Sequence, residues 1–222
     1  ILHSMIFKLK TKRRKIVKKF ITLSVLSIVI TSSFYMGTKW TGGNSSSIQS
    51  TEPIKYNMIG YYVEEPKEKY ASGQLWVWEE AQLGHKYIMG IDVSRGDSED
   101  FTSICVIDFD ERKQVMEYLG KIPPDLAADL AFKWGNLYKA YIVIDITGGM
   151  GVATSRKLQE LGYRDLYVEG ANTADKWKYN PKLLEKIPGI NFNNKRSQIV
   201  SSFEEGLRHG FQIKSHRLLE LC

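Results

Sequence analysis

Seven residues near the middle of the chain limit most strongly the folds that the sequence can adopt. Residues 140–146 ("AYIVIDI") are apolar at both odd and even positions, apart from one aspartate. A strand with one solvated face alternates apolar and polar residues, whereas a strand buried on both faces is a continuous apolar run. We therefore predict a central strand, in a sheet that helices cover on both faces.

Strand and helix signals on either side complete this pattern. After a short edge strand within "QLWVWEEAQLG", strands are predicted at residues 86–93, 102–109, 114–121, 140–146 and 165–170. Short links join the first three of these five, which is typical of an antiparallel meander. The order β-β-β-α-β-α-β-α predicts an α/β fold, with a mixed five-stranded sheet and helices on both faces.

Three amphipathic helices follow from the spacing of apolar residues. The first opens at Pro123 and Pro124, the second spans residues 152–161, and the third spans residues 197–209. We expect these helices to bury their apolar faces, which for the first helix are Leu126, Leu130, Trp134 and Leu137 and for the third are Ile199, Phe203 and Leu207.

The N-terminal quarter differs in kind from the rest. Residues 1–53 contain the basic run "KLKTKRRKIVKK", 17 uncharged residues ("FITLSVLSIVITSSFYM") and a linker rich in Gly, Ser and Thr. Three interpretations stay open: a signal-like membrane anchor, a wrongly joined segment, and a genuine soluble element. We expect one globular domain at residues 54–222, shortened at its C-terminus, and a membrane partner is the minor expectation.

The net charge of +6 comes from the N-terminal segment. Residues 1–40 carry nine Lys or Arg and no Asp or Glu, whereas residues 41–222 carry 22 basic and 25 acidic residues. Any contact of the domain with nucleic acid must therefore be local. The two cysteines, Cys105 and Cys222, form neither a disulfide framework nor a zinc motif, which favours a reducing, intracellular setting.

Two aspartates occupy costly positions in this scheme. Asp92 lies near the end of the strand predicted at residues 86–93, and Asp145 is the only charged residue between Ala140 and Gly151. A lone ionised carboxylate in a buried strand costs several kcal/mol unless something neutralises it. Two such groups at the carboxyl ends of neighbouring parallel strands would repel one another and favour a divalent cation, of which Mg²⁺ is the natural choice.

Competing motifs are absent or weak. Counted from Asp92, the sixth position of an EF-hand loop would be Asp97 instead of Gly, and an integrin-type metal motif would need Ser where Gly96 stands. No Walker A loop occurs, so we expect no ATP site in this chain. "TGGMG" at residues 147–151 resembles a phosphate loop only loosely, and a tight strand-to-helix turn is the favoured interpretation.

These residues carry a family likeness. The element order with its two aspartates resembles the ribonuclease H-like pattern. More specifically, "GIDVSRGDSEDFTSICVIDF", "GKIPPDLAADL" and "IVIDITGGMGVATSRKLQELGY" resemble the C-terminal nuclease domain of the large terminase subunit of tailed phages. The resemblance runs from about Trp76 to the C-terminus.

The resemblance implies a Mg²⁺- or Mn²⁺-dependent endonuclease that cuts concatemeric double-stranded DNA in viral DNA packaging, in the host cytoplasm during virion assembly. Asp92 and Asp145 match the catalytic metal ligands, and Asp100 matches an auxiliary ligand, whereas Asp97 and Glu99 are expected on the loop surface. Two ions about 4 Å apart would act on the phosphodiester. Implied partners are the packaging ATPase domain, the small terminase subunit and the portal.

The sequence departs from the family at its third catalytic carboxylate, for which Glu204, Glu205 and Glu220 are available but do not match. We therefore expect this chain to bind metal weakly and to cut poorly. Expected phosphate contacts, chosen for basic residues near aromatic ones or at the start of the third helix, are Lys176, Lys178, Lys195 and Arg196.

Two alternatives stay open. An actin-like or sugar-kinase fold also opens with Gly-Ile-Asp on a first strand, although "VSRGDSED" is too acidic to cradle a phosphate. A non-catalytic ribonuclease H-like module that docks a partner would share the fold without the chemistry.

Overall fold

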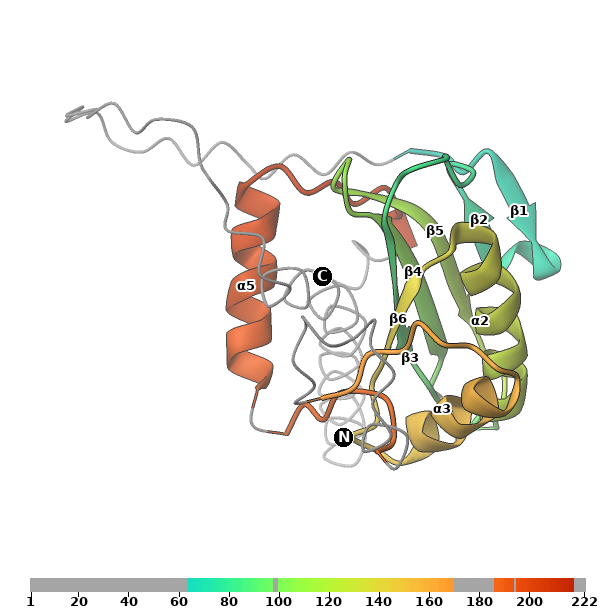
Figure 1. The fold of residues 1–222 in the computed structure, drawn as a ribbon. Coiled ribbons are helices and arrows are strands. Elements are labelled where there is room, and N and C mark those ends of the chain that lie inside the picture. Colours follow the sequence, from blue (N-terminus) through green and yellow to red (C-terminus); the bar gives the residue numbers. More distant parts are fainter. Residues whose placement is uncertain (1–63, 98–99, 170–185, 194, 218–222) are drawn as a thin grey trace, which may run out of the picture.

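The computed structural model describes residues 64–97, 100–169, 186–193 and 195–217 of the 222-residue chain. Figure 1 shows its elements, which in chain order are β1 (Glu68–Tyr70), a short 3-10 helix (Ala71–Gly73), β2 (Leu75–Val77), β3 (Tyr87–Asp92), β4 (Thr102–Asp108), β5 (Lys113–Gly120), α2 (Pro124–Tyr138), β6 (Tyr141–Ile144), α3 (Met150–Glu160) and α5 (Arg196–Arg208).

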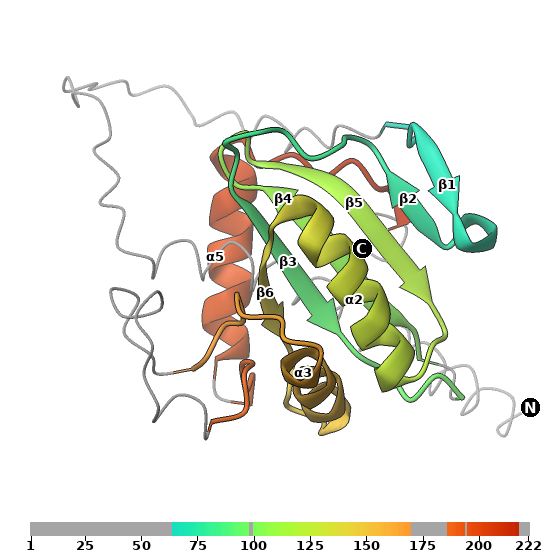
Figure 2. The same cartoon turned by 45° about the vertical axis from the view of Figure 1, so that its right-hand side comes forward.

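The strands form one mixed sheet in the order β1-β2-β5-β4-β3-β6 (Figure 2). The pair β3–β6 is parallel, and the other neighbouring pairs are antiparallel. The predicted meander corresponds to β3, β4 and β5. The strand predicted to be central corresponds to β6, which is buried as predicted but stands last in the strand order, with only isolated bridges beyond it in the described part of the chain. The sheet has six strands where the sequence predicted five: β1 and β2 extend it beyond β5, and the strand predicted at residues 165–170 is not among the six. The strand β2 is the short edge strand predicted within "QLWVWEEAQLG".

The predicted strand at residues 165–170 is wrong as a regular strand. Leu166 pairs with Ile142 and Val168 with Gly189, each as an isolated bridge. Directly after β6, on the same side of that strand, Ile190 pairs with Asp145. Two short segments thus share the position beside β6, so neither gives a continuous periodic signal in the sequence.

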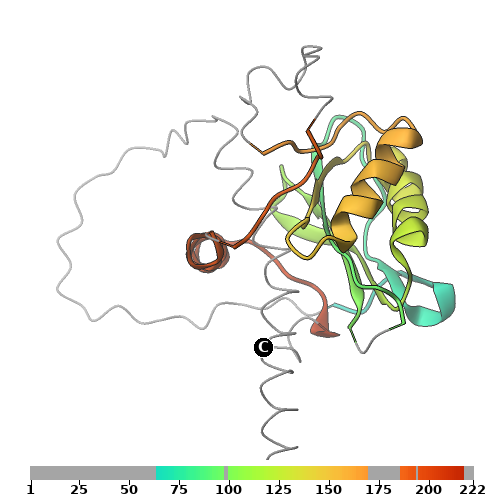
Figure 3. The ribbon, with the colours of Figure 1, turned by 90° about the horizontal axis from the view of Figure 1, so that it is seen from below.

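Helices cover both faces of the sheet, as predicted, and Figure 3 shows α5 on one side and α2 and α3 on the other. Met89 and Ile91 of β3 pack with the α2 and α3 side, whereas Ile88 packs with the α5 side. The alternation of neighbouring residues between two cores is what a strand buried on both faces requires. The predicted apolar face of α5 is confirmed, since it buries Ile199, Phe203 and Leu207.

The predicted face of α2 is right in part. Trp134 is buried and Leu130 packs against the core, but Leu126 is 50% exposed and Leu137 is 57% exposed. The helix buries a face of mostly small residues, Ala127, Ala128, Ala131, Trp134, Gly135 and Tyr138. A Cβ at Gly135 would lie 2.8 Å from the Tyr163 hydroxyl, so this glycine, which weakens the helix locally, allows close packing. Small side chains bring α2 close to the sheet, which apolar spacing alone does not reveal.

The last described residues return along the sheet and close a buried ion pair. Glu117 of β5 is fully buried, and its Oε2 accepts hydrogen bonds from the Ser215 hydroxyl and from Arg217 Nη2, the latter at 3.1 Å. The Arg217 guanidinium also lies 3.6 Å from the ring centroid of Trp76 on β2. This buried carboxylate therefore receives its cation from the chain itself.

The N-terminal segment 1–53 and the expected domain start at residue 54 lie outside the described residues. Within the part of the chain that the structure describes, no helix has both the length and the apolar character needed to cross a membrane.

Candidate metal centre

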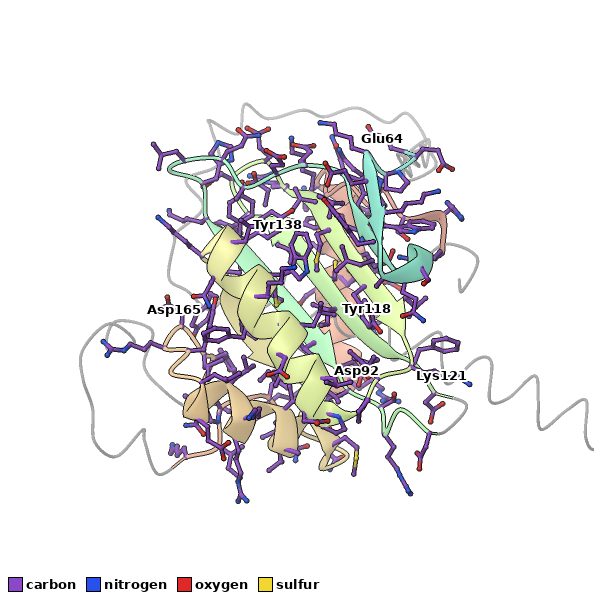
Figure 4. All side chains as sticks on the ribbon, turned by 90° about the vertical axis from the view of Figure 1, so that its right-hand side faces the viewer. Glu64, Asp92, Tyr118, Lys121, Tyr138 and Asp165 are labelled. Atoms are coloured by element: carbon purple, nitrogen blue, oxygen red, sulfur yellow. The ribbon has the colours of Figure 1, made fainter. Side chains whose placement is uncertain are left out.

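Parallel pairing of β3 and β6 brings Asp92 and Asp145 together. The last ladder pair is Ile91 with Ile144, and the Asp145 backbone N–H then donates to the Ile91 carbonyl at 2.9 Å. The next residue on each strand is an aspartate, so the two carboxylates lie at the same edge of the sheet. Figure 4 shows Asp92 at this end, near Lys121 and away from Glu64 and Tyr138.

Asp92 is poorly compensated. Its Oδ2 atom is buried and has no hydrogen-bond partner. Burial raises the pKa of Asp92 to about 8, and the negative charges of Asp145 and Asp100 add to this rise. The Val93 N–H and the Arg196 guanidinium oppose it only in part. A buried, unpaired carboxylate oxygen beside a second carboxylate is the environment that a divalent cation relieves.

Asp145 has more support than Asp92. Burial raises the pKa of Asp145, whereas the hydroxyl and the backbone N–H of Thr147 lower it by hydrogen bonding. The N–H of Thr147 donates to Asp145 Oδ1 at 2.8 Å, which closes a tight turn directly after the strand. Thr147 was not among the predicted site residues. The Asp-x-Thr spacing, which permits such a turn, was the available signal.

The turn from β6 into α3 depends on glycine at two positions. Gly149 has φ 83°, in the left-handed region. A Cβ at Gly151 would lie 1.9 Å from the Asp145 carbonyl oxygen, so only glycine lets α3 begin this close to the strand end. The tight turn that the sequence favoured for residues 147–151 is therefore what the structure shows.

The segment after β3 is held by β4 and by the backbone before α2. Ser94 and Gly96 connect it to Thr102 and to the backbone before α2, since the Ser94 N–H donates to Thr102 Oγ1 at 3.1 Å. Asp97 is exposed and pairs with Arg95 at 3.1 Å, as a surface residue would. Glu99 lies outside the described residues. Asp100 is exposed and acts on Asp92 through its charge.

A third ligand does not join the pair among the described residues. No group of three or more His, Cys, Asp or Glu side chains there could hold a metal ion. Glu204 and Glu205 are exposed on α5, and Glu220 lies outside the described residues. The candidate ligands within the described part of the chain are thus the two aspartates, and the charge of Asp100 acts on Asp92.

The predicted phosphate contacts have different surroundings. Arg196 is exposed at the start of α5, and its charge reaches both Asp92 and Asp145. Lys195 forms an ion pair with Glu169, so its ammonium would have to exchange this partner for a phosphate. Lys176 and Lys178 lie outside the described residues.

No protein-family model matches the sequence, and no curated protein matches it. Solved structures do. The fold of this chain is similar to that of large terminase nucleases. The magnesium-bound large terminase nuclease from thermophilic phage G20c is 19% identical, with 72% of this chain and 74% of that chain covered and a TM-score of 0.48.

Two further large terminase nuclease structures have similar identities, coverages and TM-scores. The zinc-bound form of the G20c nuclease is 18% identical, covers 72% of this chain and 81% of that chain, and has a TM-score of 0.49. The large terminase nuclease domain of Thermus phage P74-26 is 14% identical, covers 71% of this chain and 70% of that chain, and has a TM-score of 0.47.

Proposed function

We propose that this chain is a metal-dependent endonuclease domain of a large terminase subunit, acting on double-stranded DNA. The observation that carries the proposal is the pair of carboxylates, Asp92 and Asp145, at adjacent ends of parallel strands, with one buried oxygen unpaired. Oxygen ligands of this kind suit Mg²⁺ or Mn²⁺, which usually take one or two protein carboxylates and keep several waters.

The chain's own residues divide the work in this proposal. Asp92 and Asp145 would hold the metal, with Asp100 as an auxiliary ligand. Two bound Mg²⁺ or Mn²⁺ ions would supply an activated water and charge stabilisation for the leaving oxygen. Arg196 would contact phosphate next to the carboxylates, which explains a basic residue at this acidic edge.

DNA contact in this proposal is local and made to phosphate. Lys176, Lys178, Lys195 and Arg196 are the proposed contacts, on a domain that is acidic overall. Changing both Lys176 and Lys178 to Glu would weaken DNA binding and flatten its dependence on salt, as measured by fluorescence anisotropy. The proposed setting is the host cytoplasm, where the packaging ATPase domain, the small subunit and the portal would be partners.

Thermal unfolding and nicking of supercoiled plasmid, each titrated with Mg²⁺ or Mn²⁺, would test the function. We expect the metal to stabilise the wild-type chain and to support weak nicking. Asp92→Asn should abolish both effects, whereas Asp97→Asn, the same change on the exposed aspartate paired with Arg95, should preserve them.

Each part of the proposal can fail separately. Nicking by Asp92→Asn at the wild-type rate would remove Asp92 from the site. A wild-type chain that shows neither stabilisation nor nicking with either metal would contradict the proposal as a whole. Stabilisation without any nicking would favour a non-catalytic module, the alternative that shares this fold.

A further inference from the structure

Thr147 occupies a position between three segments at the edge of the sheet. It follows β6 by three residues and precedes α3 by three. Its backbone N–H donates to Asp145 Oδ1 at 2.8 Å, and its hydroxyl oxygen accepts the Phe192 backbone N–H at 2.8 Å. Thr147 therefore bonds to a proposed metal ligand through its backbone and to the segment that pairs beside β6 through its side chain.

The side chain of Thr147 fixes the position of its own backbone. Its hydroxyl oxygen accepts the Phe192 N–H, which holds the residue where its backbone N–H donates to Asp145 Oδ1. Hydrogen bonding from Thr147 lowers the pKa of Asp145 against the effect of burial. Within the described part of the chain, Asp145 Oδ1 receives its hydrogen bond from this N–H.

Backbone pairing fixes both ends of this connection. Ile190 donates to the Ile144 carbonyl at 2.8 Å, and Ile146 donates to the Ile190 carbonyl at 3.0 Å. Phe192 itself is buried in the core on the α5 side of the sheet. The Phe192 N–H, which donates to the Thr147 hydroxyl, is thus held in place by a packed segment.

We propose that Thr147 is a positioning residue that fixes the orientation of the Asp145 carboxylate for a divalent cation, using the buried Phe192 backbone as its support. The inference rests on the proposed function, because it needs Asp145 to be a metal ligand. Groups that orient a ligating carboxylate typically change metal affinity by 10- to 100-fold when they are removed.

The full 222-residue chain in four forms would test this role. They are wild type, Thr147→Val, Thr147→Ser and Thr154→Val. Thr154 is a matched control, because it is fully buried and its hydroxyl donates to the Pro124 carbonyl at 2.8 Å, away from the carboxylate pair. The Val changes remove a hydroxyl at constant shape, and Ser retains it.

The measurement is the concentration of Mn²⁺ that gives half of the maximal rise in unfolding temperature. We expect Thr147→Val to raise this concentration about 10-fold, and Thr147→Ser and Thr154→Val to leave it unchanged. Hydrogen exchange of the Phe192 amide should accelerate in Thr147→Val and stay slow in Thr147→Ser. Should Thr147→Val not fold, Thr147→Ala is the replacement, with the same expectation.

The outcomes separate this role from the proposed function. Equal half-saturation for Thr147→Val and wild type would overturn the positioning role while leaving the metal site intact. A fall in stability of Thr147→Val without a shift in half-saturation would show a purely structural threonine, as Thr154 is, and would also overturn it. No response of the wild type to Mn²⁺ would overturn the proposed function and this inference together.

Discussion

The same sheet contains two buried carboxylate sites whose neighbours differ. Glu117 on β5 faces Arg217 and Ser215, whereas Asp92 on β3 faces Asp145. Burial raises the pKa of both acids, but Arg217 and Ser215 lower that of Glu117, and the charge of Asp145 raises that of Asp92 further. Glu117 is bonded directly to a cation of the chain, whereas the Val93 N–H and the charge of Arg196 only partly offset the like charges around Asp92. In the proposed function, a cation from outside the chain completes this compensation at Asp92.

The largest expected effect comes from removing the cation at Glu117. Arg217→Ala would leave a buried carboxylate uncompensated and lower the free energy of unfolding by about 4 kcal/mol. Arg95→Ala removes the same side chain from an exposed ion pair with Asp97 and should change it by less than about 0.5 kcal/mol. Urea unfolding of both variants measures the difference. Equal stability of the two variants would show that Glu117 does not depend on its partner.

The next largest effect concerns Gly151, where α3 begins in close contact with the Asp145 backbone. Gly151→Ala would force a Cβ against the Asp145 carbonyl oxygen and should lower the free energy of unfolding by about 3 kcal/mol. We expect the stabilisation by Mn²⁺ to be lost as well. Gly148→Ala is the control, because its added Cβ would meet nothing within 4 Å. Thermal unfolding with and without Mn²⁺ compares the two. A stable Gly151→Ala chain with a normal Mn²⁺ response would show that this approach is not required.

The Asp92 site should show an unusual dependence on pH when divalent cations are removed with EDTA. The folded-state pKa is about 8, above the unfolded value of about 4. Between these values the folded chain keeps a proton that the unfolded chain has lost, so stability falls as pH rises. We expect Asp92→Asn to remove the part of this slope that comes from Asp92. At pH 8 its free energy of unfolding should exceed that of the wild type by about 2 kcal/mol, since the partial exposure of Asp92 reduces the effect that the full pKa shift would have.

Urea unfolding from pH 4.5 to 8.5 measures this slope, and Asp97→Asn is its control. Added Mn²⁺ should reverse the order of stability at pH 8, because metal binds the deprotonated pair. The assignment would be contradicted by an Asp92→Asn chain that keeps the wild-type slope.

The smallest expected effect concerns Asp108, a buried acid that, like Glu117, has a basic partner within the chain. His85 Nδ1 lies 2.6 Å from Asp108 Oδ2, and this hydrogen bond raises the pKa of His85. The contribution to stability is fully present below the unfolded His pKa, about 6.5, and is lost as pH rises through the folded value. His85→Gln should remove a small fall in the urea midpoint above neutral pH. An unchanged pH profile in His85→Gln would show that the pair does not contribute.

Much of the fold follows from local patterns. The buried strand at residues 140–146, the meander and the apolar face of α5 were predicted because each depends on the periodicity of one continuous segment. The buried face of α2 was predicted only at Trp134 and Leu130, since small residues make up most of that face. The strand at residues 165–170 was not, since two separate segments share one edge of the sheet.

At the candidate site, the sequence alone determines that two aspartates end strands, and strand order then brings them to one edge. The periodicity of a segment does not predict, however, which side chains from other segments will bond to its residues. The cation for Glu117 comes from 100 residues downstream, and the support of Thr147 comes from 45 residues downstream. Which carboxylate the chain pairs with a cation and which it leaves poorly compensated depends on contacts between distant segments, and these exist only after the sheet and its covering segments have packed.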